Sequence, residues 1–198
     1  MMGTDFFQAI YNHPSLKLRD YELISEAHTK MDFQQGALLL EIGKIAHEFY
    51  IIEKGLFRSF LYDYNGKETT TAFYCPKEIV IESLSLFQRI PSKENFQAIT
   101  DTVVWKIEYK AFQELLNKIE GLREWGRTWA TNQLFVLKQH SINLLTMSAT
   151  DRYLELIHDK PQIIIQSPLK YIASYLGVTD TSLSRIRKEI SMSRHYLP

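Results

Sequence analysis

The segment from Ser167 to Ile190, SPLKYIASYLGVTDTSLSRIRKEI, limits more than any other what this chain can fold into. Ser167 followed by Pro168 is typical of a helix start, because serine can cap the first turn and proline lacks only an N–H that is unpaired there anyway. Apolar residues then recur with the spacing of one helix face, at Leu169, Ile172, Ala173 and Leu176. Gly177 predicts the end of this helix, because glycine adopts the left-handed backbone conformation without a Cβ penalty.

A second short helix is predicted after Thr179, whose hydroxyl can cap it. Its apolar side carries Leu183, Ile186 and Ile190. At about 100° per residue, the opposite side carries Thr181, Ser184, Arg185 and Lys188. An ordinary helical hairpin inside a core would explain the apolar spacing, but not an outer face of small hydroxyls and cations. The pattern therefore favours a helix-turn-helix whose second helix is exposed for DNA recognition.

The residues predicted to contact DNA are Thr179, Thr181, Ser182, Ser184, Arg185 and Lys188. Arg185 is the candidate base reader, because an arginine in the major groove can donate to two acceptors of one guanine. Thr179 and Ser182 are short donors at a helix N-terminus and suit phosphate oxygens, whereas Lys188 lies further along and suits the DNA backbone. The alternative is that Arg185 only pairs with Glu189 on the surface, which would contribute little.

Composition is that of an ordinary globular protein: 45% of the 198 residues are apolar, 23% are charged, and the net charge is zero. The charge is uneven, because residues 161–198 carry five lysines and arginines against two carboxylates, an excess of three positive charges that suits phosphate contact. The single cysteine, Cys75, excludes an internal disulfide and a four-cysteine metal site. Neither a secretory signal nor a membrane span is visible, so a soluble cytoplasmic protein is expected.

The first half of the chain changes from helical to strand patterning. Residues 5–31 read as helix interrupted at Pro14, and short apolar or alternating segments follow at 38–42, 48–52, 56–64, 67–74 and 96–107. Asn65-Gly66 is a strong hairpin signal, because a type I′ turn needs positive φ at both central positions. Short strands with turns at these intervals predict an antiparallel barrel or sandwich.

A long, uninterrupted helix is predicted from about Ala111 to about Met147, followed by another from Thr150 to about Asp159. The long helix has one apolar face at Trp125, Trp129 and Val136, and a second at Ala130, Leu134, Leu137 and Leu144. A helix with two apolar faces either runs through a core or packs its own chain on one side and a partner chain on the other. Because helix-turn-helix proteins usually work in pairs, we expect a two-fold dimer, with the tryptophan face at the seam.

The order of these parts resembles a known family. A glycine-punctuated roll, a long helix, and the elements IA-x-x-LGV at 172–178 and LSR at 183–185 are similar to bacterial transcription regulators typified by the catabolite activator protein and the fumarate–nitrate reduction regulator. FYIIEKG at 49–55 and NGKE at 65–68 also look like the family's strand-and-turn pattern. The resemblance implies an effector-sensing β-roll, a homodimer, double-stranded DNA as partner and contact with RNA polymerase. For a dimer, the operator should be an inverted repeat with half-sites about 34 Å apart.

The sequence departs from this family in two places. The family's phosphate-binding cassette usually opens with Gly-Glu and later presents Arg-Ser or Arg-Thr to the cyclic phosphate. Here Lys77-Glu78 stands at the opening and Ser92-Lys93 at the arginine position, so the resemblance implies Glu78, Ser92 and Lys93 as the ligand-binding candidates. Lysine offers a point charge where arginine grips with two parallel hydrogen bonds, so tight binding of cyclic AMP is not expected. The family's β-wing is predicted to be absent or vestigial after Ser191.

An enzyme is the remaining class of function to consider for this sequence. A cupin-type metal site needs two or three histidines with a carboxylate, and among the strands only His47 is present. A haem sensor would have only His47 or Cys75 as an axial ligand, and no G-x-S-x-G nucleophile motif occurs. We therefore predict no catalytic residue, no metal ligand and no cofactor.

The sequence predicts an α+β fold in three parts. Residues 1–120 form an antiparallel β-roll (jelly-roll) sensor domain of the cyclic-nucleotide-binding type with N-terminal helices, 121–146 a dimerisation helix, and 147–198 a helix-turn-helix domain. The expected function is sequence-specific DNA binding by a homodimeric transcription regulator with an unidentified effector and no membrane association. The alternative is a ligand- or partner-sensing module of the same fold that no longer regulates through DNA.

Overall fold

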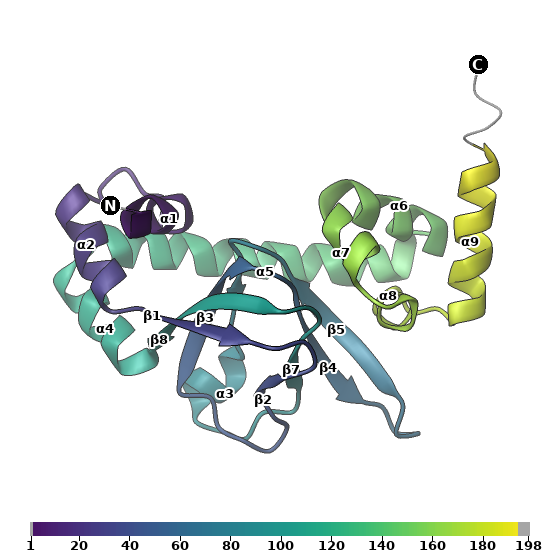
Figure 1. The fold of residues 1–198 in the computed structure, drawn as a ribbon, viewed down its shortest axis with the longest axis horizontal. Helices are drawn as coiled ribbons and strands as arrows, with labels where there is room; N and C mark the ends of the chain where they lie inside the picture. The colour runs from purple at the N-terminus through teal and green to yellow at the C-terminus, as the bar shows by residue number, and fades with distance from the viewer. Residues whose placement is uncertain (1, 194–198) are drawn as a thin grey trace.

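The structure, a computed structural model, describes residues 2–193. Within them, two N-terminal helices precede a roll of strands, a long helix runs past the roll, and a group of helices follows (Figure 1). The elements in chain order are α1 (Met2–Ile10), α2 (Leu18–Glu26), β1 (Thr29–Phe33), β2 (Leu38–Leu40), β3 (Glu48–Lys54), β4 (Phe57–Tyr62), β5 (Glu68–Tyr74), β6 (Ile79–Val80), α3 (Ser83–Gln88), β7 (Asn95–Ala98), β8 (Thr102–Glu108), α4 (Tyr109–Lys118), α5 (Glu120–Thr146), α6 (Ala149–Asp159), α7 (Pro161–Gln166), α8 (Leu169–Tyr175) and α9 (Asp180–Ser193).

The strands form two antiparallel four-stranded sheets, in the orders β1-β8-β3-β6 and β2-β7-β4-β5. Apolar residues from both sheets fill the space between them, and these are Tyr50, Ile52, Phe57, Val80, Phe96, Ala98 and Val104. Because strand side chains alternate between faces, each sheet turns one apolar face inward. The predicted α+β fold with an antiparallel roll is confirmed.

The β4–β5 hairpin is confirmed, but its turn differs from the predicted type I′. Only Gly66 of the Asn65-Gly66 pair has positive φ, at 76°. The carboxylate of Asp63 accepts hydrogen bonds from the backbone N–H groups of Asn65 (2.8 Å) and Lys67 (3.0 Å). This side chain satisfies the turn's donors, so the loop spans five residues, 63–67, with glycine only at its left-handed position.

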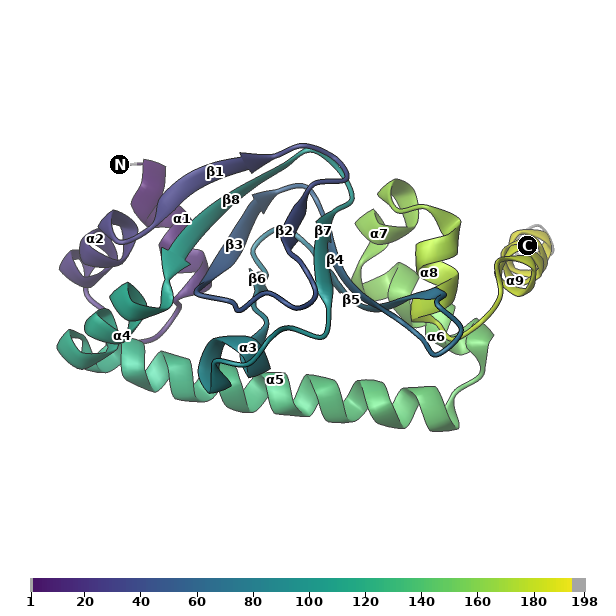
Figure 2. The same cartoon turned by 90° about the horizontal axis from the view of Figure 1, so that it is seen from below.

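The helices on either side of the roll differ in detail from the prediction. The helical reading of residues 5–31 extends too far, because Thr29–Phe33 is β1, paired with β8. The long helix is not continuous, since Ile119 is extended (φ −119°, ψ 103°) and separates α4 from α5. From there α5 runs along the roll toward α6 (Figure 2). No helix among residues 2–193 combines the length and apolarity needed to cross a membrane.

Trp125 belongs to the chain's own core, so its predicted place at a dimer seam is wrong. Its side chain is 7% exposed and its indole N–H donates to the Ile10 carbonyl at 3.0 Å. Its ring packs edge-on against Tyr11, with centroids 4.5 Å apart, and stacks at 6.0 Å on Trp129, which also packs against this core. The tryptophan face of α5 therefore anchors the N-terminal helices to the roll.

The C-terminal helices share a core with one edge of the roll. Residues of α6–α9 pack with four side chains from the roll, Leu56, Phe73, Cys75 and Ile99. The predicted cap by Ser167 is wrong: α8 begins at Leu169 after Pro168, and the Ser167 hydroxyl is buried with no hydrogen-bond partner among the described residues. The predicted lack of a wing concerns the chain after Ser191, of which residues 194–198 lie outside the described part.

Candidate functional site

Helices α8 and α9 form a compact unit joined by a tight turn. Gly177 has φ 69°, and the Val178 N–H bonds back to the Ala173 carbonyl at 2.9 Å, closing the end of α8. The Thr179 hydroxyl accepts from the Ser182 N–H at 3.1 Å and so caps α9 as predicted. Both ends of the turn thus follow from residues next to it in the sequence.

The two sides of α9 differ as the sequence pattern predicts. Leu183 and Ile186 are buried, at 0% and 9% exposure, against the core of the C-terminal helices. Thr179, Thr181, Ser184, Arg185 and Lys188 are exposed, and Ser182 is half-buried. Figure 1 shows α9 at the outer end of the molecule, with α8 between it and the roll. The predicted DNA-contacting residues therefore lie on an accessible surface of hydroxyls and cations at the start and middle of one helix.

Of the three predicted ligand contacts, Ser92 and Lys93 are neighbours in one loop, and Glu78 pairs with a residue of the C-terminal part of the chain. The Glu78 carboxylate accepts from Lys160 of the C-terminal helices at 2.7 Å and from the Cys75 N–H at 2.9 Å. Ser92 is 3% exposed, and its hydroxyl serves its own loop, donating to the Glu94 carbonyl at 2.8 Å. Lys93 is exposed.

Two carboxylates that the sequence pattern did not single out, Glu82 and Glu94, are half-buried in the roll. Glu82 caps α3 by accepting from the Ser85 N–H, and it lines a cavity of only about 50 Å³ together with Tyr50 and Phe96. Burial raises the pKa of Glu94 above the usual carboxyl range, opposed by a hydrogen bond from Thr71 and reinforced by Glu82. The S-L-S-L-F run after Glu82 could have marked it as a helix cap, since a carboxylate before a helix accepts its first N–H groups. This part of the roll therefore brings two carboxylates, Glu82 and Glu94, close enough for each to feel the other's charge.

Glu94→Gln should stabilise the protein at neutral pH. A carboxyl whose folded pKa lies above its unfolded value, about 4.3, favours folding when protonated. The protonated carboxyl's contribution to the free energy of unfolding is fully present below the unfolded pKa and is lost as pH rises through the folded pKa. The amide removes the buried charge, so the variant's melting temperature should exceed that of the parent at pH 7.5 and match it below about pH 4. The exposed control Glu22→Gln should shift neither value, and an equal gain for Glu94→Gln at both pH values would contradict this assignment.

A larger cavity, of about 470 Å³, lies between the roll, α5 and the C-terminal helices. Aromatic side chains including Phe73, Trp129 and Tyr175 line it, with Lys77 and the Glu78–Lys160 pair at its polar side. Its size and mixed lining are those of small-molecule sites. Among residues 2–193, no group of three or more His, Cys, Asp or Glu side chains could hold a metal ion.

The second half of α5 leaves an apolar stripe uncovered. The stripe consists of Ala130, Leu134, Leu137, Leu144 and Leu145. Leu134, Leu137 and Leu145 are 66%, 63% and 87% exposed. Isolated exposed leucines are common, but a run along one helix marks an interaction surface. Most of this stripe is the second apolar face predicted from the sequence.

Comparison with known proteins finds a family model that matches part of the chain. Residues 30–119 match the cyclic nucleotide-binding domain family. The chain is also 28% identical over 121 residues to the cAMP-dependent protein kinase regulatory subunit of Colletotrichum orbiculare. That match covers 61% of this chain and 30% of the subunit, so the chain spans less than a third of the curated relative that it matches.

Solved structures extend the likeness over most of the chain. FixK2 from Bradyrhizobium japonicum matches with a TM-score of 0.72 at 17% identity, covering 84% of this chain and 85% of FixK2. The catabolite activator protein of Thermus thermophilus matches with a TM-score of 0.57 at 16% identity, covering 91% and 86%. The predicted resemblance is confirmed at the level of the fold. The chain thus contains, at residues 30–119, a domain that matches the cyclic nucleotide-binding family, set within the overall fold of the catabolite activator protein and FixK2.

Proposed function

We propose that this protein is a homodimeric, sequence-specific DNA-binding transcription regulator with a sensing β-roll, acting in the cytoplasm, and not an enzyme. The observation that carries the proposal is the exposed face of α9, where Arg185 and Lys188 stand among hydroxyls, above a buried apolar side. This helix-turn-helix surface combines base-reading and phosphate-contacting groups at the N-terminal half of one helix. The shared fold with the catabolite activator protein supports the same reading, and contact with RNA polymerase belongs to the proposal.

Selection from random-sequence DNA followed by gel retardation tests the function directly. The regulator should enrich an inverted repeat and bind it at least about a thousandfold more tightly than scrambled DNA at physiological salt. Enrichment of no sequence, together with weak binding that disappears at moderate salt, would contradict the proposal. That outcome would favour the alternative, a sensing module of the same fold that has lost DNA regulation.

The dimer is assigned to the stripe Ala130, Leu134, Leu137, Leu144 and Leu145 of α5 instead of the tryptophan face. Trp125 and Trp129 pack within their own chain, whereas the leucines of the stripe are uncovered. Pairing two copies of α5 about a two-fold axis would bury the stripe on both chains and give one assembly two copies of α9 related by that axis.

The roll should not bind cyclic AMP tightly. The arginine position holds Ser92, which is buried and bonded within its loop, and the roll carries two half-buried carboxylates, Glu82 and Glu94. Loss of charge-assisted hydrogen bonds costs about 1.5–3 kcal/mol each, which moves a micromolar site toward the millimolar range. Calorimetry should therefore detect no binding at micromolar cyclic AMP. A dissociation constant near one micromolar or below would contradict the assignment of Ser92 to the arginine position.

A further inference from the structure

Arg58, in strand β4, is a buried cation at the boundary between the roll and α8. Its side chain is 1% exposed, although it carries a full charge. The guanidinium lies between two aromatic rings, 4.1 Å from the centroid of Phe60 on its own strand and 3.4 Å from that of Tyr171 on α8. A guanidinium stacks well on aromatic faces, and the attraction grows when water is excluded.

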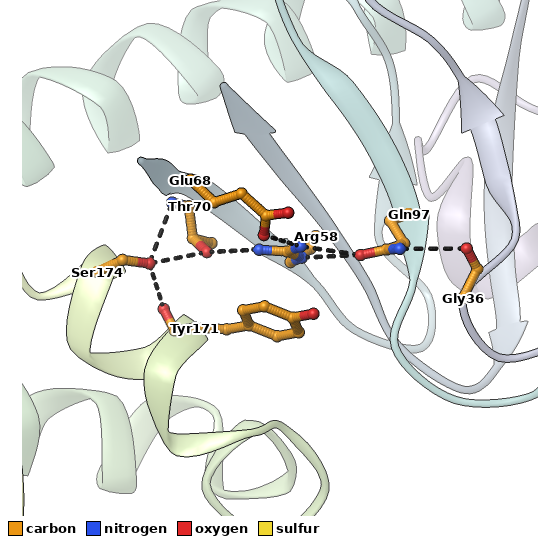
Figure 3. A network of polar contacts seen from close by, with 7 residues as sticks. All are labelled: Gly36, Arg58, Glu68, Thr70, Gln97, Tyr171 and Ser174. Carbon is orange, nitrogen blue, oxygen red and sulfur yellow. Dashed lines mark hydrogen bonds and ion pairs between the residues drawn. The ribbon is translucent and has the colours of Figure 1, made fainter. Parts of the chain in front are cut away.

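Polar partners from the roll hold the guanidinium in this place (Figure 3). It donates to the Glu68 carboxylate at 2.7 Å, to the Gln97 side-chain oxygen at 2.9 Å and to the Thr70 hydroxyl at 3.4 Å. The side-chain amide of Gln97 in turn donates to the Gly36 carbonyl at 3.1 Å. The roll therefore fixes the Arg58 side chain, and α8 supplies the ring that covers it.

Helix α8 also seals the open edge of the second sheet. Strand β5 is an end strand in the order β2-β7-β4-β5, so part of its backbone has no strand partner. The Thr70 N–H donates instead to the Ser174 hydroxyl of α8 at 3.1 Å, and that hydroxyl donates to the Thr70 hydroxyl at 3.0 Å. These contacts join residues 104 positions apart in the chain.

A bulge in β5 allows residues on both sides of it to contact α8. In the β4–β5 pair, Ser59 lies opposite Ala72 and the next residue, Phe60, lies opposite Thr70. Thr71 is therefore the extra residue of a β-bulge. A bulge reverses the alternation of side chains beyond it. Thr70 contacts Ser174 and Phe73 packs edge-on against Tyr175, with centroids 5.2 Å apart, on this same side.

We propose that Arg58 is the positioning residue that, through Tyr171, fixes the helix-turn-helix on the roll and so holds the two recognition helices of a dimer at one spacing. The proposal rests on the proposed function. The backbone passes from α5 to α6 through Met147 and Ser148, and Asn143 of α5 also donates to Glu155 of α6 at 2.8 Å. The Arg58–Tyr171 contact acts together with this bond, the shared apolar core and the Glu78–Lys160 pair to set the orientation of the C-terminal helices. Because a dimeric DNA reader matches its half-site spacing to the distance between recognition helices, a fixed junction confers a strict spacing requirement.

The test compares Tyr171→Ala with Tyr171→Phe in the full-length protein. Phenylalanine keeps the ring over Arg58, whereas alanine removes it, and Tyr171 is only half-buried, so both chains should fold. Hydrogen exchange measured by NMR at the Thr70 amide reports the junction without DNA, and the amides of Val104 and Ile107 in the roll report global folding. Gel retardation on inverted repeats lengthened or shortened by one or two base pairs between half-sites reports the spacing requirement.

Tyr171→Ala should speed exchange at Thr70 by at least about tenfold, with Val104 and Ile107 unchanged, because local opening exposes the amide. The same variant should bind the altered operators within about threefold of the parent operator, whereas the wild type and Tyr171→Phe should reject them by more than about tenfold. Protected Thr70 in Tyr171→Ala, or unchanged spacing preference, would overturn the proposal. If no form of the protein binds DNA specifically, the regulatory function fails, while the exchange result still decides whether the ring over Arg58 holds the junction.

Discussion

Arg185→Ala should remove most of the protein's preference for its operator over scrambled DNA. Arg185 is exposed on α9, opposite the buried Leu183 and Ile186, and lies in the N-terminal half of the helix. In helix-turn-helix proteins, the N-terminal residues of the recognition helix are the ones that contact base edges in the major groove. A bidentate arginine–guanine pair is worth about 1–3 kcal/mol of discrimination, and a dimer makes it twice. We therefore expect the specificity ratio to fall by at least about thirtyfold, since 1.4 kcal/mol corresponds to about tenfold.

Lys188→Ala is the matched control, because it also removes one exposed cation from α9. Lys188 lies about one turn further along and suits phosphate, so this variant should weaken binding to operator and scrambled DNA alike. It should also lower the slope of log affinity against log salt by about one. If Arg185→Ala keeps the operator preference and only lowers the salt slope, Arg185 contacts phosphates and another residue reads the bases.

Leu134→Glu should convert the protein to a monomer at micromolar concentration. Leu134 is 66% exposed in the single chain and lies in the α5 stripe. Burying a leucine fully contributes about 1.5–3 kcal/mol, and the substitution removes two such contributions and places two carboxylates across a two-fold axis. Light scattering should therefore report half the mass of the wild type. Binding to an inverted repeat should fall with it, because each chain would then occupy a single half-site.

Leu18→Glu provides the control for a general effect of the new charge. Leu18 is 72% exposed on α2, far along the chain from the stripe, and the same substitution there should leave the dimer intact. A Leu134→Glu protein that stays dimeric would place the seam elsewhere. The circular dichroism of both variants should match the wild type, since both positions are solvent-exposed within one chain.

Features that depend on near neighbours were readable from the sequence. The α8–α9 unit follows from apolar positions at helical spacing, the positive φ of Gly177 and the Thr179 cap, each decided within about four residues. The β4–β5 hairpin was located by Asn65-Gly66, although its turn type was decided by a side chain, Asp63, that bonds the turn's N–H groups. The two apolar faces of α5 were also visible as a pattern. The sequence did not show which of the two faces packs within the same chain, because helical periodicity marks an apolar face without identifying the residues that cover it.

Only the tertiary structure decided which groups meet across the chain. It turned Trp125 inward against Tyr11 and left Leu134 uncovered, so the proposed dimer seam moved from one face of α5 to the other. It also showed that Glu94 is half-buried in the roll, where burial raises its pKa, and that Glu78 forms an ion pair with Lys160. Arg58 reads in the sequence as an ordinary strand cation. Its burial under Tyr171 depends on a bulge and a docked helix more than a hundred residues further on, and such long-range packing leaves no local pattern.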